Sequence, residues 1–257
     1  MKVFPARTYL NTGIFSLLCL SMIFCVTACS NLVKEQKLEI IGAEKLYLKA
    51  GAAVANGDVE SSFGILEQAF MAGLENPMRI VRDSAFYSLV DDAEYRKRTR
   101  GLIKQYSSQC HADMIRNDEA GERIFIKGKV LDERDGKAVT QVFIELVHAD
   151  EQGLYSNENL SWNPRLFAYL KTDENGEFSV TTIKPGSYPD DDENDVASHV
   201  HFSLELKEYR TYYSEFTFDD DPVFKANGNI ESVPVAHLSG KEDSKFYQVV
   251  IYMQRDH

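Results

Sequence analysis

Basic residues are scarce in this 257-residue sequence. It has 28 lysines and arginines against 40 aspartates and glutamates, which gives a formal net charge of -12. Nucleic acids and anionic lipid headgroups bind proteins largely through clustered positive charge. The acidic balance therefore argues against nucleic acid as a partner and against a membrane contact held by electrostatic attraction.

The sequence also lacks a long apolar run at its start. Residues 14–28 (IFSLLCLSMIFCVTA) are apolar and follow the basic residues Lys2 and Arg7. This run is shorter than the roughly 20 residues that a membrane-spanning helix needs, and its flanks are typical of a secretory signal peptide. We predict that residues 1–28 are removed; an uncleaved signal helix is the alternative. In both cases the functional part would lie outside the cytoplasm.

The end of this segment, Val26-Thr27-Ala28-Cys29, resembles the lipobox of bacterial lipoproteins. The resemblance implies that Cys29 carries lipid, that residues 29–42 form a polar tether, and that acyl chains attach the protein to a membrane. Ser30 follows the cysteine, in place of the aspartate that would indicate retention in the inner membrane. We therefore expect a lipid-anchored protein of the bacterial cell envelope, in the outer membrane, facing the periplasm or the exterior.

Cysteine is scarce as well. Cys19 and Cys25 lie in the predicted signal and Cys29 would carry the lipid, so Cys110 is the remaining thiol. One thiol cannot form an intramolecular disulfide, a thiolate zinc site or an iron–sulfur cluster. Any bound metal must therefore use oxygen and nitrogen ligands.

The first folded segment, residues 43–116, is predicted to be helical. Its apolar residues recur at helical spacing: Leu46, Ala50, Ala53 and Val54, then Phe63, Leu66, Ala69 and Phe70. Asn56-Gly57-Asp58 ends one helix and caps the next. The spacing of about 34 residues resembles a tetratricopeptide-like pair. So short an array cannot form a solenoid. We expect a cap on the following domain, or a docking surface for a protein partner or a second copy.

From residue 117 onward, period-two alternation replaces the helical pattern. Strands are predicted at Ile124–Ile126, Val142–Leu146, Glu177–Val180, His199–Leu206, Tyr213–Phe218 and Tyr247–Met253. Many short strands separated by Gly and Asp turns predict an antiparallel β-sandwich over residues 117–257. The predicted fold class is therefore mainly β, preceded by the small α-helical segment.

Residues 181–202 contain a concentrated set of potential metal ligands. His199 and His201 are separated by one residue, so in an extended strand both rings point to the same side. Prolines and a glycine flank Tyr188 and predict a fixed turn around it. A phenolate with two imidazoles suits ferric iron better than zinc or ferrous iron. The alternative is an ordinary pair of surface or half-buried histidines beside a packing tyrosine.

Several stretches follow one another over roughly residues 121–222: GKVLDERDGKAVTQVFIELVHADEQGLYS, LKTDENGEFSVTTIKPG, TTIKPGSYP, HVHF and YYSEFTFDDDP. In this order they resemble the intradiol ring-cleavage dioxygenases, non-haem ferric enzymes related to catechol 1,2-dioxygenase and protocatechuate 3,4-dioxygenase. The first stretch resembles the family's first strands, and the second resembles the segment before its second tyrosine. TTIKPGSYP and HVHF resemble its ligand segments, and the last stretch resembles the strand after them.

The resemblance implies a ligand set for Fe(III) made of Tyr155, Tyr188, His199 and His201. It implies a catechol-like substrate that chelates the iron through both oxygens, and O2 as the second substrate. The bond between the two hydroxylated carbons would break. Tyr188 would leave the metal and take up a substrate proton. Glu215 stands where the family has a glutamine, and we count it among the catalytic residues.

Two further positions depart from the family pattern. Val196 stands where an arginine would stabilise negative charge, and Val147 replaces a tryptophan. One missing electrostatic donor can reduce the rate by about 10²–10³, unless Arg165, Lys171 or Lys184 supplies the charge. A second function therefore stays open: a catalytically inactive metal-binding or partner-binding β-sandwich module.

The other candidate residues have simpler interpretations. We interpret His148 as a packing or pocket histidine, Trp162 as a pocket wall, and His111 and His237 as surface residues. The acidic run 190–195 could bind calcium but lacks an alternation of ligands, so we interpret it as a solvated loop.

Overall fold

The computed structural model describes residues 42–156, 162–189, 194–227, 233–240 and 245–256. The predicted signal peptide, the lipidation site Cys29, almost all of the tether and most of the acidic run 190–195 lie outside these residues. Within them, no helix is both long and apolar enough to cross a membrane. The domain boundaries and the anchor therefore stay predictions.

The chain begins with short helices. A first helix covers residues 42–55, and it is followed by α2 (Val59–Met71), α3 (Arg79–Arg82), a 3-10 turn (Ser84–Phe86), α4 (Tyr87–Asp91) and α5 (Ala93–Tyr106). Asp58 caps α2 by accepting a hydrogen bond from the Ser61 amide, and Gly57 has a φ of 79°, so the predicted helix break is confirmed. The tetratricopeptide-like character of the segment stays a prediction.

The rest of the described chain is mostly β. Its strands are β1 (His111–Asp113), β2 (Arg123–Asp132), β3 (Phe143–His148), β4 (Leu166–Lys171), β5 (Glu177–Ile183), β6 (Tyr188–Pro189), β7 (Asp195–Val196), β8 (His199–Glu205), β9 (Tyr212–Phe218), β10 (Val235–Leu238) and β11 (Lys245–Met253). The one helix described among them is α6 (Pro222–Asn227).

Nine of these strands form one sheet in the order β1-β5-β2-β11-β10-β9-β8-β3-β4. The edge strands β1 and β4 lie next to each other, so the sheet is nearly closed. β6 and β7 form a separate two-stranded ribbon at one end of it. The prediction of purely antiparallel pairing is wrong at three places, because β1 with β5, β2 with β11, and β9 with β10 run parallel. Alternation within a strand does not reveal the direction of its neighbour.

The core lies between the two halves of the curled sheet. Alternate residues of each half point inward and are buried, among them Ile126, Val180 and Ile251 from one half and Val200, Phe202 and Phe216 from the other. The two-layer sandwich remains our interpretation of this arrangement.

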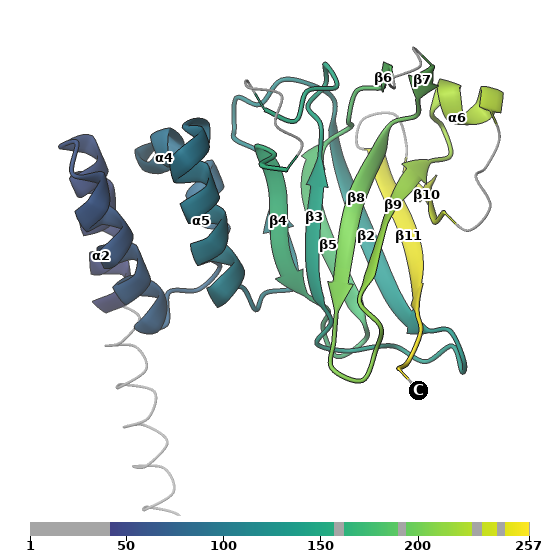
Figure 1. Cartoon of the computed structure of the whole chain (residues 1–257), viewed down its shortest axis with the longest axis horizontal. Helices are drawn as coiled ribbons and strands as arrows, with labels where there is room; N and C mark the ends of the chain where they lie inside the picture. Colours follow the sequence, from purple (N-terminus) through teal and green to yellow (C-terminus); the bar gives the residue numbers. More distant parts are fainter. Residues whose placement is uncertain (1–41, 157–161, 190–193, 228–232, 241–244, 257) are drawn as a thin grey trace, which may run out of the picture.

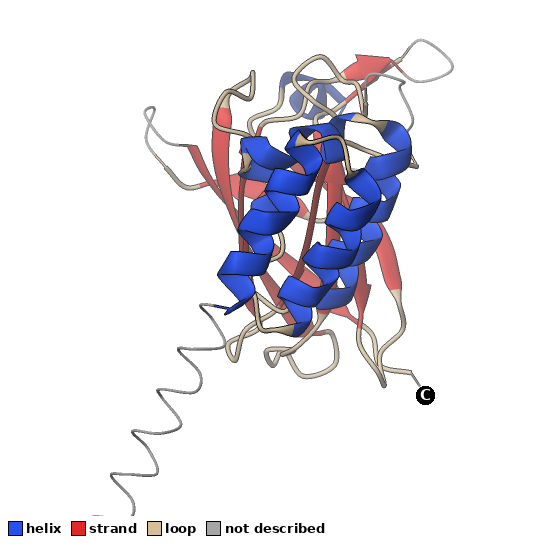
Figure 2. Cartoon of the chain, turned by 90° about the vertical axis from the view of Figure 1, so that its left-hand side faces the viewer, coloured by secondary structure: helices blue, strands red, loops and turns tan. Residues whose placement is uncertain are grey.

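In Figure 1, α5 lies next to β4 and β3, and Figure 2 shows the helices in front of one face of the sheet. Arg100 of α5 bonds the Glu145 carboxylate of β3 at 2.8 Å, and the buried side chain of Arg96 donates to the Asn163 carbonyl in the loop before β4. The same face of the sheet continues through β8 and β9, where it carries the histidines discussed next.

Candidate metal centre

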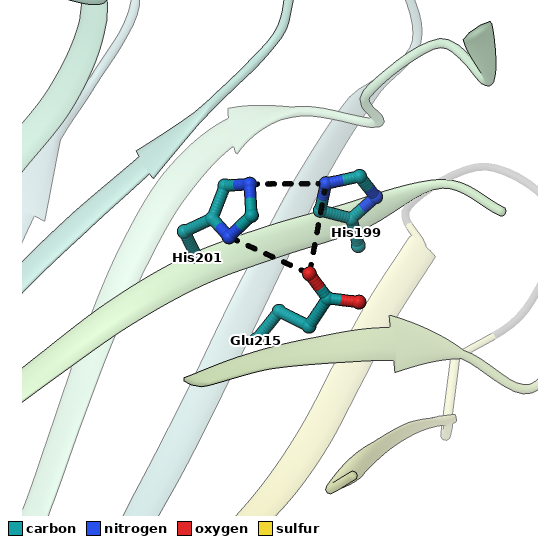
Figure 3. A group of neighbouring side chains, drawn as sticks. All are labelled: His199, His201 and Glu215. Carbon is teal, nitrogen blue, oxygen red and sulfur yellow. Dashed lines mark hydrogen bonds and ion pairs between the residues drawn. The ribbon is translucent and has the colours of Figure 1, made fainter. Parts of the chain in front are cut away.

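His199 and His201 lie on the outer face of β8, which runs between β3 and β9. Their neighbours Val200 and Phe202 point the other way and are buried in the core. This alternation places both imidazoles on one side, as the sequence predicts. Figure 3 shows the two rings approaching each other above β8, with the Glu215 side chain of β9 beside them.

Two tyrosines complete the group. The Tyr155 hydroxyl lies 3.1 Å from the Tyr188 hydroxyl, 2.8 Å from His201 Nε2 and 3.4 Å from His199 Nε2. The Tyr188 hydroxyl lies 3.1 Å from His199 Nε2, which is 3.2 Å from His201 Nε2. Four side chains from three separate stretches of the chain therefore converge on one small volume; we call them the donor cluster.

The contacts of the two histidines indicate which ring nitrogen faces the donor cluster. His199 Nδ1 lies 2.7 Å from the Ala197 carbonyl oxygen, which can only accept, so Nδ1 carries the proton and Nε2 presents its lone pair to the cluster. His201 directs Nδ1 toward Glu215 and Nε2 toward the cluster. In the metal-free protein the Tyr155 and Tyr188 hydroxyls can donate to these two nitrogens, and a bound cation would accept both lone pairs instead.

The spacing fits a metal ion. Nitrogen and oxygen ligands about 2.0–2.2 Å from one ion lie about 2.8–3.5 Å from one another. Five donor-atom pairs of the cluster are 2.8 to 3.4 Å apart. Two phenols and two imidazoles are a donor set for a first-row transition metal.

Burial favours the uncharged forms of Tyr155 and His201. Desolvation, reinforced by the neighbouring Tyr188 hydroxyl, raises the pKa of Tyr155 far above its usual value. Desolvation, together with nearby His199, lowers the pKa of His201. The lowered pKa of His201 favours its neutral imidazole, which can bind a metal. The phenol of Tyr155 loses its proton only when a cation binds beside it.

The backbone around each tyrosine is held by turn hydrogen bonds. Before Tyr155, the Asp150 carboxylate accepts from the amides of Gln152 and Leu154. Tyr188 pairs with Val196 in the ribbon of β6 and β7. The two turns are joined directly, since the Gly186 amide donates to the Asp150 carbonyl at 2.8 Å.

Glu215 lies on β9 directly opposite His201. Its carboxylate is 3.5 Å from His201 Nδ1 and 3.9 Å from His199 Nε2. His199, His201 and Glu215 also form a group that could hold a metal ion. The structure thus places the predicted residue Glu215 beside the donor cluster.

The cations that could replace the missing arginine are occupied or distant. Arg165 forms a bidentate ion pair with Glu119, at 2.7 and 2.8 Å. Lys184 bonds Asp220 at 2.5 Å. Lys171 lies opposite Phe143 in the pairing of β4 with β3. Phe143 is at the other end of β3 from Val147, the residue opposite His201, so Lys171 is distant from the site. The Glu119 and Asp220 partners were not predicted, because both pairs join residues far apart in the sequence.

The remaining candidates lie outside the donor cluster. His148 is fully buried and bonds the Ala149 carbonyl and the Thr182 hydroxyl, both at 2.6 Å. His111 and His237 are partly exposed and contact Ser179 and Asp219. The exposed Trp162 lines a small open pocket against α5 with five other residues: Lys97, Arg100, Gly101, Asn163 and Tyr169.

A family model described as "Dioxygenase" matches residues 102–245, more than half of the chain. The protocatechuate 3,4-dioxygenase beta chain of Burkholderia cepacia is 29% identical over 136 residues, which are 48% of this chain and 56% of that protein. The hydroxyquinol 1,2-dioxygenase of Corynebacterium glutamicum is 26% identical over 126 residues, 44% of this chain and 42% of that protein. The chain thus spans about half the length of the curated relatives it matches.

Among solved structures, the 3-chlorocatechol 1,2-dioxygenase of Rhodococcus opacus 1CP matches with a TM-score of 0.47 and 21% identity, over 56% of this chain and 64% of that chain. The catechol 1,2-dioxygenase of Pseudomonas arvilla C-1 matches with a TM-score of 0.48 and 20% identity, over 58% of each chain. Because the family model matches more than half of it, this chain belongs to the intradiol ring-cleavage dioxygenases, a family of non-haem iron enzymes that act on catechol-like compounds with O2.

Proposed function

We propose that the protein is a ferric intradiol dioxygenase, which opens the ring of a catechol-type aromatic between its two hydroxylated carbons. The observation that carries the proposal is the convergence of Tyr155, Tyr188, His199 and His201 at 2.8 to 3.4 Å. Two anionic phenolates are hard ligands and favour Fe(III) over zinc. Bound ferric iron would withdraw electron density from a chelated catecholate and so prepare the ring for reaction with O2.

The two tyrosines would have different roles because they are held differently. Tyr155 is buried and contacts all three other members of the donor cluster, so it would be a permanent ligand. Tyr188 is half-buried in a two-residue strand at the end of the sheet. It is therefore the ligand that can swing away, and its phenolate would accept a proton from the incoming catechol hydroxyl.

Glu215 would orient His201. A carboxylate facing Nδ1 of a metal-bound histidine fixes the tautomer and strengthens the nitrogen as a ligand. The 3.5 Å separation places Glu215 in position for this role.

We also propose that this domain works outside the cytoplasm, attached to the outer membrane through a lipid on Cys29, with residues 1–28 removed. The lipobox-like sequence supports this proposal. The test is mass spectrometry of the mature N-terminus, together with Cys29→Ala, which should move the protein from the membrane fraction to the soluble fraction. Unmodified Cys29, or an unchanged distribution of the variant, would contradict it.

The test of the enzymatic proposal has three steps. Iron-loaded protein should show the visible charge-transfer band of tyrosinate bound to Fe(III). Catechol added without O2 should shift this band. With O2 present, the protein should consume O2 and release a ring-opened dicarboxylate.

A second candidate function is a metal-binding module without catalysis, which Val196 favours because it places no positive charge beside Tyr188. A band that shifts with catechol but gives no O2 uptake would establish this alternative. Absence of the band after iron loading would overturn both functions.

A further inference from the structure

The donor cluster is open toward Glu215. The His199 side chain is 3% exposed and Tyr155 is buried, whereas the side chains of His201 and Glu215 are 40% and 28% exposed. Glu215 lies beside both rings, on the side where β9 borders β8 (Figure 3). His201 and Glu215 are therefore, with the half-buried Tyr188, the side chains of the site that solvent and a ligand can reach.

The charge of Glu215 has no cationic partner. Within the described part of the chain, no lysine or arginine lies within 4 Å of its carboxylate, and its ion-pair contacts are the two histidine rings. These rings are neutral when they bind a metal. Glu215 therefore adds a negative charge at the accessible side of the donor cluster, and no lysine or arginine of the described residues offsets it.

Among the described residues of the segments around the site, the cations are already paired. Arg165, which follows the Tyr155 loop, is neutralised by Glu119 in a largely buried bidentate pair. Lys184, which precedes the Tyr188 turn, is neutralised by Asp220. Val196 lies opposite Tyr188 and is uncharged.

We infer that Glu215 is a specificity-determining residue that selects catechols by the charge of their ring substituent. The site would accept catechols with a neutral or an ammonium-bearing substituent and reject those with a carboxylate. This inference rests on the proposed function, since it presumes a catechol bound at the donor cluster. An interaction between two unit charges near a protein surface changes affinity on the order of tenfold.

The test uses three ligands that share one ring: catechol, 3,4-dihydroxybenzoate, and 4-(2-aminoethyl)catechol. Each is titrated into the iron-loaded full chain without O2, and the shift of the visible band gives Kd. In the wild type, the carboxylate ligand should bind at least about tenfold more weakly than the amine. In Glu215→Gln, which keeps the size of the side chain and removes its charge, the two should bind within about twofold of each other.

Glu177→Gln is the matched control. Glu177 forms an ion pair with Lys127 at the start of β5, whereas Lys184 and the Tyr188 turn follow its end. Removing the charge of Glu177 should therefore preserve the wild-type order of affinities. Equal binding of the amine and the carboxylate by the wild type, or a preserved difference in Glu215→Gln, would overturn the inference but leave the proposed function intact. If no catechol shifts the band of the wild type, both fall.

Discussion

A Cβ atom at Gly186 would lie 2.4 Å from the carbonyl oxygen of Glu151. The two turns approach as closely at Gly153, where a Cβ atom would lie 2.8 Å from Cβ of Tyr188. The turn before Tyr155 and the turn before Tyr188 thus pack backbone against backbone. The two turns joined in this way carry the tyrosines whose hydroxyls lie 3.1 Å apart.

Gly186→Ala should therefore disturb the metal site without touching a ligand. The added methyl group meets backbone atoms, which cannot move aside alone, so the two turns must separate. We expect a shifted visible band and weaker iron binding. Gly101→Ala in α5 is the control, because a Cβ there has open space; it should preserve the band and stabilise the protein by about 0.5–1 kcal/mol. An unchanged band in Gly186→Ala would show that the packing does not position the tyrosines.

Removing each tyrosine hydroxyl should separate their roles. Tyr155→Phe deletes the group that contacts all three other donors, and should abolish most of the visible band and lower iron affinity. Tyr188→Phe should retain iron and part of the band but slow turnover by about 10²–10⁴, the range for a lost general base. Absorption spectra, iron content and O2 uptake check both variants. An unchanged spectrum in Tyr155→Phe would mean that the ligand assignment is wrong.

The sequence predicts the elements that carry Tyr188, His199 and His201 because their patterns are local, whereas Tyr155 is identified only by the family resemblance. The alternation around His199 and His201 identifies a strand with two faces, and the glycine and prolines around Tyr188 identify a turn. β4 was missed for the opposite reason. All but the last of its residues are buried, so the alternation that marks a half-exposed strand is absent.

Long-range pairing could not be predicted in the same way. The charge of Arg165 is neutralised by Glu119, which precedes it by 46 positions and comes close to it only in the folded protein. The parallel pairing of β2 with β11 joins segments more than a hundred residues apart. Sequence alone therefore suggests Arg165 as a free cation, whereas its charge is already neutralised.

Arg96 should be the residue through which α5 supports the Tyr155 side of the site. It is 1% exposed, and its guanidinium donates to the carbonyls of Val90, Asp91 and Asn163, each at 3.0 Å. Arg96→Ala would leave these carbonyls without that donor and open a cavity. We expect a loss of about 3 kcal/mol in the free energy of unfolding, together with a weaker iron band.

Arg98→Ala, two positions further along α5, is the control for this prediction. Arg98 pairs with Glu60 at the surface, and such pairs contribute about 1 kcal/mol or less. Urea unfolding of both variants gives the comparison. Equal losses would show that the buried contacts of Arg96 stabilise the protein no more than a surface ion pair does.

His148 should make the stability of the metal-free protein depend on pH. Burial lowers the pKa of this histidine to about 4, against about 6.5 in an unfolded chain. Between these values the unfolded chain binds a proton that the folded chain does not. Stability therefore rises with pH through this window and is lost as pH falls from 6.5 toward 4. From pH 7 to pH 5, His148 should contribute a loss of about 2 kcal/mol, measured by urea unfolding. His148→Gln should remove that contribution, and an equal loss in wild type and variant would contradict the prediction.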